Sequence, residues 1–157
     1  MERFAKQYPG ITVKGLKFFR GMEGHGFNAS IYMGGKKLCF TMDEGSGGEP
    51  HYDWEEGGER TLQTLVEIKR AEIPADQESD GFNDREMFCL DIMVEDILIA
   101  WEREKNFLRD LKRKTIFDVK GELREINRPF DPKIKQHLVA KYGPQIEILN
   151  ETWVTCG

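Results

Sequence analysis

The sequence predicts an α+β fold in which an antiparallel meander of three to four strands packs on a long central helix, with a second hairpin and a C-terminal helix. Three patterns support this prediction. A glycine pair at residues 34–35 separates two alternating segments, an apolar stripe at helical spacing runs through residues 87–101, and residues 131–144 carry the signals of both ends of a helix.

The glycine pair predicts the first hairpin. Gly34 and Gly35 tolerate the positive φ angles of a two-residue type I′ turn. Counting outward from this turn places Ile31–Leu38, Ala29–Phe40 and Phe27–Met42 on one face of the sheet, and Tyr32–Lys37, Ser30–Cys39 and Asn28–Thr41 on the other. The first face is apolar and the second mostly polar, so we expect one face to be covered and the other to be open.

Two further strands flank this hairpin. Residues 12–20 form the preceding strand, with Leu16 and Phe18 facing the core. A glycine-rich turn joins that strand to the hairpin, and a glycine-rich loop leads from the hairpin to residues 51–54, which return as a short fourth strand.

Helical periodicity follows the sheet. Residues 59–70 form a short amphipathic helix, and residues 71–82 form a surface loop that contains a proline and a glycine. Asn83, with Glu86 three residues later, resembles the capping box that starts a long, buried helix. The apolar stripe of this helix consists of Met87, Leu90, Val94, Ile97, Leu98 and Trp101.

The last third of the chain predicts a hairpin, a helix and a closing strand. Residues 115–119 and 122–126 form the hairpin around Lys120-Gly121, and residues 146–149 form the closing strand. The start and stop signals of the helix between them are Asp131 as N-cap, Pro132 at the first helical position and Gly143-Pro144 after the end.

Length and composition bound the class of protein. With 157 residues, no internal repeat and no long polar linker, we expect one domain, residues 1–157. No window reaches the roughly 18 apolar residues of a membrane span, and residues 1–10 lack the apolar stretch of a signal peptide, so we expect a cytoplasmic protein with no membrane partner. Cysteines 39, 89 and 156 are an odd, widely spaced set, which predicts free thiols. The net charge of −5 makes nucleic acid an unfavourable partner.

The one strong local charge signal lies at residues 43–59, which carry seven acids and no Lys or Arg. Tyr52 and Trp54 are interleaved with these acids. Aromatic side chains exposed in a charged loop are typical anchors for a protein partner. The alternative is that Trp54 packs under the hairpin.

Two glycine-dense segments, 21–26 and 45–48, fall at the same edge of the predicted sheet. They either expose backbone N–H groups to a small anionic ligand or serve as turns between strands. The candidate ligand- or partner-binding residues in and beside them are Gly24, His25, Asp43, Glu44, Gly47, Gly48, His51, Tyr52, Asp53 and Trp54.

Catalytic and metal signals are weak. Ser46 with His51 and Asp53 forms the one cluster of nucleophile, base and acid. No strand leads into this cluster as in a nucleophile elbow, so we assign no catalytic residue. A binding protein is therefore favoured over an enzyme. The three histidines lack ligand spacing, so we expect no metal and no cofactor. Asp91 and Glu95 either form a general acid/base pair or lie on a solvated stripe. The basic cluster 109–114 either contacts phosphate or an acidic partner, or is simply the charged C-terminal end of a helix.

Several segments resemble a group of small uncharacterised proteins of phages, prophages and other mobile elements. In the first half these are Gly21-Met-Glu-Gly-His-Gly-Phe-Asn-Ala-Ser-Ile-Tyr32, Gly35-Lys-Lys, Gly47-Gly and Tyr52-Asp-Trp54; in the second half they are Lys114-Thr-Ile-Phe-Asp-Val-Lys-Gly121, Pro132 and Lys141-Tyr-Gly. The resemblance covers about two-thirds of the chain and carries no catalytic residue. It implies a location in a host cell and an accessory, anti-defence type of role.

Two hypotheses follow. The first is a non-enzymatic accessory protein that binds and modulates a host or defence protein through the acidic glycine-rich loop and the open sheet face. The second is a domain that binds or sequesters a small phosphorylated ligand, such as a nucleotide, in the glycine loops. A small hydrolase would need Ser46, His51 and Asp53 to converge. An unpaired hairpin edge also allows a homodimer.

Overall fold

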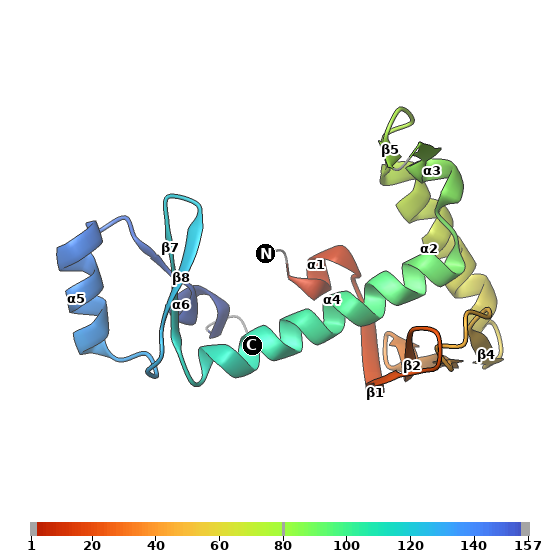
Figure 1. Cartoon of the computed structure of the whole chain (residues 1–157), viewed down its shortest axis with the longest axis horizontal. Helices are drawn as coiled ribbons and strands as arrows, with labels where there is room; N and C mark the ends of the chain where they lie inside the picture. The colour runs from red at the N-terminus through yellow and green to blue at the C-terminus, as the bar shows by residue number, and fades with distance from the viewer. Residues whose placement is uncertain (1–2, 80, 155–157) are drawn as a thin grey trace. The chain divides into compact units, whose positions relative to one another are not determined.

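The computed structural model describes residues 3–79 and 81–154. The chain divides into two compact units, Met1–Glu102 (unit 1) and Arg103–Gly157 (unit 2), which Figure 1 colours from red to green and from blue-green to blue. The expected α+β class is confirmed: a four-stranded antiparallel sheet, a further hairpin, a long helix and a C-terminal helix are all present. The expectation of a single folding domain stays a prediction, and the two units are described separately.

Unit 1 contains the meander and the helices that cover it. Its elements are α1 (Phe4–Gln7), β1 (Ile11–Arg20), β2 (His25–Met33), β3 (Lys36–Asp43), β4 (His51–Trp54), α2 (Gly58–Glu72), β5 (Glu78–Ser79), β6 (Phe82–Asn83), α3 (Asp84–Met87) and the first part of α4 (Leu90–Leu111). The sheet order is β1-β2-β3-β4, all antiparallel, which confirms the fourth strand. The segment expected as a plain loop, 71–82, contains most of the small β5–β6 hairpin.

The register of the central hairpin differs from the predicted one. Gly34 and Gly35 have positive φ angles, 58° and 85°, and Tyr32 pairs with Lys37 as expected. A β-bulge follows at Leu38, so every later pair slips by one residue, and Cys39 rather than Leu38 lies opposite Ile31. A bulge places two residues against one, and the side chains beyond it therefore exchange faces.

Strand β1 is irregular as well. Its pairing with β2 shifts between Lys14 and Lys17, where Gly15 has a φ of 66°. Leu16 packs against the core as expected, but Phe18 is 42% exposed because it lies near the end of the strand, and only the edge of its ring meets Phe27.

One apolar cluster joins the sheet to α1, α2 and α4. Its fully buried members are Ala29, Ile31, Cys39, Leu62, Val66, Met93, Val94, Ile97 and Leu98. Burial of apolar surface contributes about 25 cal/mol of stability per Å², so the burial of these side chains is the main contribution that holds the helices to the sheet. The predicted stripe of the long helix is confirmed at Val94, Ile97 and Leu98, whereas Met87 is 54% exposed.

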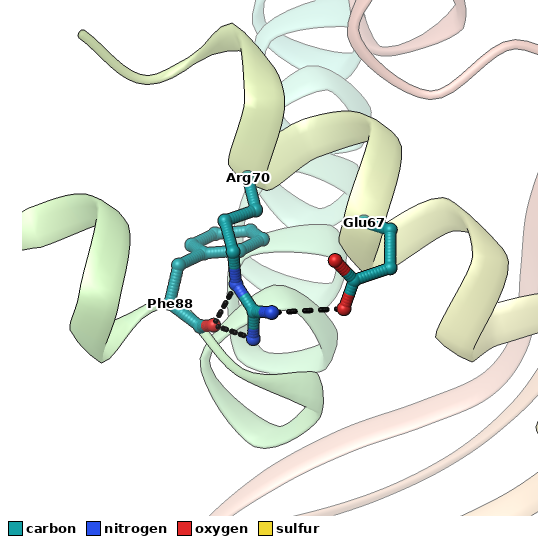
Figure 2. A network of polar contacts seen from close by, with 3 residues as sticks. All are labelled: Glu67, Arg70 and Phe88. Atoms are coloured by element: carbon teal, nitrogen blue, oxygen red, sulfur yellow. Dashed lines mark hydrogen bonds and ion pairs between the residues drawn. The ribbon is translucent and has the colours of Figure 1, made fainter. Parts of the chain in front are cut away.

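Met87 is exposed because the expected continuous helix is interrupted. Asn83 caps α3 by accepting the backbone N–H of Glu86, as predicted, but the helix stops at Phe88, which has an extended backbone (φ −65°, ψ 118°). The carbonyl group of Phe88 is thereby released from helical bonding. Arg70 of α2 binds it with two donors, Nε at 3.1 Å and Nη2 at 2.6 Å, and its Nη1 donates to Glu67 at 2.8 Å (Figure 2).

Unit 2 is built around a second sheet. Its elements after the end of α4 are β7 (Thr115–Val119), β8 (Glu122–Ile126), α5 (Pro132–Tyr142), β9 (Glu147–Ile148) and α6 (Leu149–Val154), with the strand order β8-β7-β9. The predicted hairpin is confirmed, and its turn residues Lys120 and Gly121 have φ angles of 57° and 85°. The closing strand is shorter than expected because α6 begins at Leu149.

The caps and core of unit 2 follow from its sequence. Asp131 accepts the N–H of Ile134 at 2.8 Å, and Gly143 ends the helix with a φ of 96°, as predicted. Neighbouring residues of β7 face opposite sides, so the sheet separates two small cores. Leu111, Ile116 and Leu149 form one, and Phe117, Leu138 and Ile148 form the other.

Within the described ranges, no helix is long and apolar enough to cross a membrane.

Candidate functional site

The two glycine-dense segments meet at one edge of the unit 1 sheet, as the strand order predicted, but they pack on each other. Gly45 lies so close that a Cβ placed on it would be 2.8 Å from the nitrogen of Gly26 and 3.1 Å from the carbonyl oxygen of Gly24. A Cβ on Gly21 would be 2.3 Å from the carbonyl oxygen of Glu44. The glycines allow two backbones to touch where any side chain would hold them apart.

This contact uses backbone N–H groups that an anion would need. Glu23 donates its N–H to the carbonyl oxygen of Gly45 at 2.9 Å, Gly21 donates to Gly24 at 2.8 Å, and Gly45 donates to the Asp43 carboxylate at 2.7 Å. Gly47 and Gly48 are exposed beyond the contact, as are His25 and Glu44. The geometry favours the reading of these segments as structural turns.

The aromatic residues of β4 face inward. Tyr52 and Trp54 stack with ring centroids 4.9 Å apart and an interplanar angle of 10°, and both pack against the main core. The Tyr52 hydroxyl donates to Asp91 of α4 at 2.7 Å. Burial and this hydrogen bond raise the pKa of Tyr52. The alternative reading of Trp54, packed under the hairpin, is thus the one that the structure supports.

A matching pair joins the first helix to α4. The Tyr8 hydroxyl donates to Asp96, and burial together with this hydrogen bond raises the pKa of Tyr8. Asp91 is therefore a partner of a tyrosine, and Glu95 is exposed, so the two do not form an acid/base pair. The basic cluster at 109–114 includes Lys114, which binds Glu125 at 2.9 Å.

The polar residues of β4 face outward. His51 Nε2 lies 3.0 Å from Asp53 Oδ1, with side chains 65% and 67% exposed. Ser46 is exposed in the preceding loop, and no hydrogen bond joins it to either residue in the described part of the chain. No three His, Cys, Asp or Glu residues lie close enough to hold a metal ion in the described ranges.

The outward face of the unit 1 sheet carries an ordered pattern across its four strands. The cross-strand pairing sets two rows, Lys14–Ser30–Phe40–Asp53 and Lys17–Asn28–Met42–His51. Residues that alternate with these, such as Ala29 and Thr41, are buried on the opposite face. We call these two rows, with Tyr32 and Phe19, the open face.

Charge changes sign across the open face. Lysines stand on β1, half-buried apolar side chains stand on β3, and the His51–Asp53 pair stands on β4 beside the acidic loop. The ammonium group of Lys14 lies 4.5 Å from the centroid of the Tyr32 ring. Phe19, at 39% exposure, adds a second aromatic surface at the β1 edge.

Unit 2 contains a hollow of about 790 Å³ that sequence reasoning missed. It lies among the β7–β8 hairpin, the end of α5 and the segment before β9, and its lining residues are Asp118, Val119, Lys120, Glu122, Arg124, Lys141, Tyr142, Gln145, Ile146 and Glu147. Interaction with Lys141, and then with Arg124, lowers the pKa of Tyr142. The hydrogen bond to Glu122, followed by the interaction with Tyr142, raises the pKa of Arg124.

The cysteines differ in environment. Cys39 is buried and Cys89 is exposed, and both are free thiols, as predicted. Burial raises the pKa of Cys39 to about 11. Cys156 lies outside the described residues.

No protein-family model matches this chain, and neither the curated proteins nor the solved structures include a significant match.

Sequence reasoning predicted an open sheet face but not its composition, and it missed the hollow, in both cases for physical reasons. The bulge at Leu38 turns Phe40 and Met42 outward, and no local pattern signals it. The hollow joins Lys120 of a turn to Lys141 of a helix end, which only the tertiary fold brings together. The basic and aromatic pair Lys141-Tyr142 was the one available hint.

Proposed function

We propose that the protein is a non-enzymatic binding protein that contacts a protein partner through the open face. The observation that carries this proposal is the pair Phe40 and Met42, which lie half-buried on the open face of the sheet, with charged residues on either side. Protein interfaces have this composition, an apolar centre surrounded by a polar rim.

The arrangement of charge indicates the chemistry of the partner. A partner that fits would place acidic side chains over Lys14 and Lys17 and basic side chains over Asp53. Glu44, Glu49 and Glu59, all exposed along the acidic stretch, extend the negative side. Such charges set orientation and association rate more than affinity, whereas the apolar centre supplies most of the binding free energy.

Nucleic acid fits this surface less well. Aromatic side chains on a four-stranded sheet can stack bases, and Lys14 and Lys17 would contact phosphates. The same face, however, carries Asp53 and borders the acidic loop, and the chain has a net charge of −5. Repulsion of phosphates there favours a protein partner.

The resemblance to mobile-element proteins supplies the class of partner, a host or defence protein. This part of the proposal rests on the resemblance alone.

Affinity capture from host-cell lysate, followed by measurement of Kd with the recovered protein, tests the proposal. Phe40→Thr and Met42→Thr keep the strand propensity and remove the apolar centre, and we expect each to weaken binding about tenfold or more. Leu123→Thr, an exposed apolar residue of β8 in unit 2, is the matched control. Unchanged binding in both open-face variants would refute the proposal.

A further inference from the structure

The hollow in unit 2 has several cations in its lining, two of them beside one aromatic ring. The charged groups of Lys141 and Arg124 lie 5.1 Å and 5.9 Å from the centroid of the Tyr142 ring. The Tyr142 ring packs against Phe117, with centroids 5.8 Å apart. A third cation, Lys120, lines the same hollow. Three positive groups therefore line the hollow, and two of them lie beside the Tyr142 ring.

Two of the three carboxylates in the hollow already accept a hydrogen bond from the protein. Asp118 accepts the N–H of Gly121 at 2.7 Å, and Glu122 accepts from Arg124 at 3.0 Å. In contrast, neither Lys120 nor Lys141 forms an ion pair with a carboxylate anywhere in the described residues. The lining has as many acids as bases, and Arg124 and Glu122 are paired with each other. Asp118 and Glu147 form no ion pair in the described part of the chain either, so the hollow offers both free cations and free carboxylates.

The acids nevertheless restrict what kind of anion fits. Asp118 and Glu147 are direct partners across β7 and β9 and border the hollow together. A bare anion would be repelled on that side, whereas hydroxyl groups would donate hydrogen bonds to these carboxylates. Val119 and Ile146 add apolar side chains to the lining.

We propose that the hollow binds a small phosphorylated molecule that also carries hydroxyl groups, with the phosphate between Lys120, Arg124 and Lys141 and the hydroxyls on Asp118 and Glu147. Nucleoside monophosphates and sugar phosphates share this chemistry, and the volume lies in the range of small-molecule sites. The site belongs to unit 2 and is independent of the open face of unit 1, so either proposal can fail alone.

Isothermal titration calorimetry on the full chain tests the site with AMP, ribose 5-phosphate, inorganic phosphate and adenosine. We expect AMP or ribose 5-phosphate to bind more tightly than inorganic phosphate, and adenosine not to bind. Tighter binding of AMP than of ribose 5-phosphate would indicate a nucleoside monophosphate as the ligand, and the reverse order would indicate a sugar phosphate. Lys141→Met and Arg124→Met each remove a charged hydrogen bond and weaken binding about tenfold. Lys133→Met, an exposed residue of α5 outside the hollow, leaves binding unchanged.

The ionisation of Tyr142 gives a second readout. A bound phosphate draws Lys141 and Arg124 away from the phenol, so the pKa of Tyr142 should rise when the ligand is added. Titration of the tyrosinate absorbance measures this shift, and the shift should be absent in Tyr142→Phe. No binding of any phosphorylated probe to folded wild-type protein, or equal loss in Lys133→Met, overturns the site. Equal affinities for inorganic phosphate and AMP overturn the role of Asp118 and Glu147.

Discussion

The bonds from Arg70 to the Phe88 carbonyl predict a measurable share of the stability of unit 1. Arg70→Met keeps most of the aliphatic stem and removes all three hydrogen bonds drawn in Figure 2. A hydrogen bond to a charged group contributes about 1.5–3 kcal/mol, and two donors that share one carbonyl oxygen do not add fully. Because the Arg70 side chain is 34% exposed, water replaces part of the loss, and we expect a cost of about 2 kcal/mol.

The ion pair with Glu67 contributes much less. Glu67 is 65% exposed, and exposed pairs contribute about 0–1 kcal/mol. Glu67→Ala therefore tests the pair alone, and Arg60→Met, an exposed arginine on the same helix, controls for the loss of charge. Arg70→Lys, which retains a single donor group, should fall between the wild type and Arg70→Met.

Urea denaturation in a Trp153→Phe background provides the assay. This substitution removes the tryptophan of unit 2, so the fluorescence of Trp54 and Trp101 reports on unit 1 alone. The reasoning is refuted if Glu67→Ala costs as much as Arg70→Met, or if Arg70→Met and Arg60→Met have the same midpoint.

Three further predictions concern other positions. Gly45→Ala combines a φ of 67° with a Cβ that would lie 2.8 Å from a backbone nitrogen, so thermal unfolding should show a loss of about 2 kcal/mol or more, whereas Gly48→Ala, which meets nothing within 4 Å, should melt like the wild type. The pKa of Cys39 is higher in the folded chain, about 11, than the ordinary 9.0, so its contribution to stability is complete below pH 9.0 and is lost as the pH rises towards 11. Cys39→Ala should remove that part of the loss of unfolding free energy at alkaline pH, measured by urea denaturation at a series of pH values. Thiol labelling of the native protein should modify Cys89 before Cys39. Asn150 is buried and binds three backbone groups, accepting from Ile116 and donating to Leu111 and Lys114, each at 2.8 Å. Asn150→Asp turns two donors into an acceptor that faces carbonyl groups, and hydrogen exchange of the Ile116 amide should show unit 2 destabilised by about 3 kcal/mol; unchanged protection would contradict this.

Local signals predicted the elements well wherever the information is contained in a few adjacent residues. Asp131 with Pro132 defined the start of α5, and the pairs Gly34-Gly35 and Lys120-Gly121 defined both hairpin turns. Each of these depends on backbone angles or a cap that neighbouring residues supply themselves.

The errors arose where tertiary contacts decide. The helix break at Phe88 is stabilised by Arg70, eighteen residues away, and the helical pattern continues through it without a signal. The bulge at Leu38 inverts the faces of β3 and thereby the composition of the candidate site. For the glycine-dense loops the sequence left two interpretations open. The space beside their glycines is filled by a second backbone, which favours the interpretation as turns, and only the tertiary fold shows this contact.

The charge arrangement of the open face also distinguishes orientations. A binding surface that is positive along one edge strand and negative along the other has a direction, so a partner turned by half a revolution about the normal to the sheet would oppose like charges. The same rule governs two copies of this chain placed face to face. A twofold axis parallel to the strands sets Lys14 and Lys17 of each copy over β4 of the other, whereas an axis across the strands opposes lysine to lysine. Symmetry about the first axis alone is compatible with the charges on this surface.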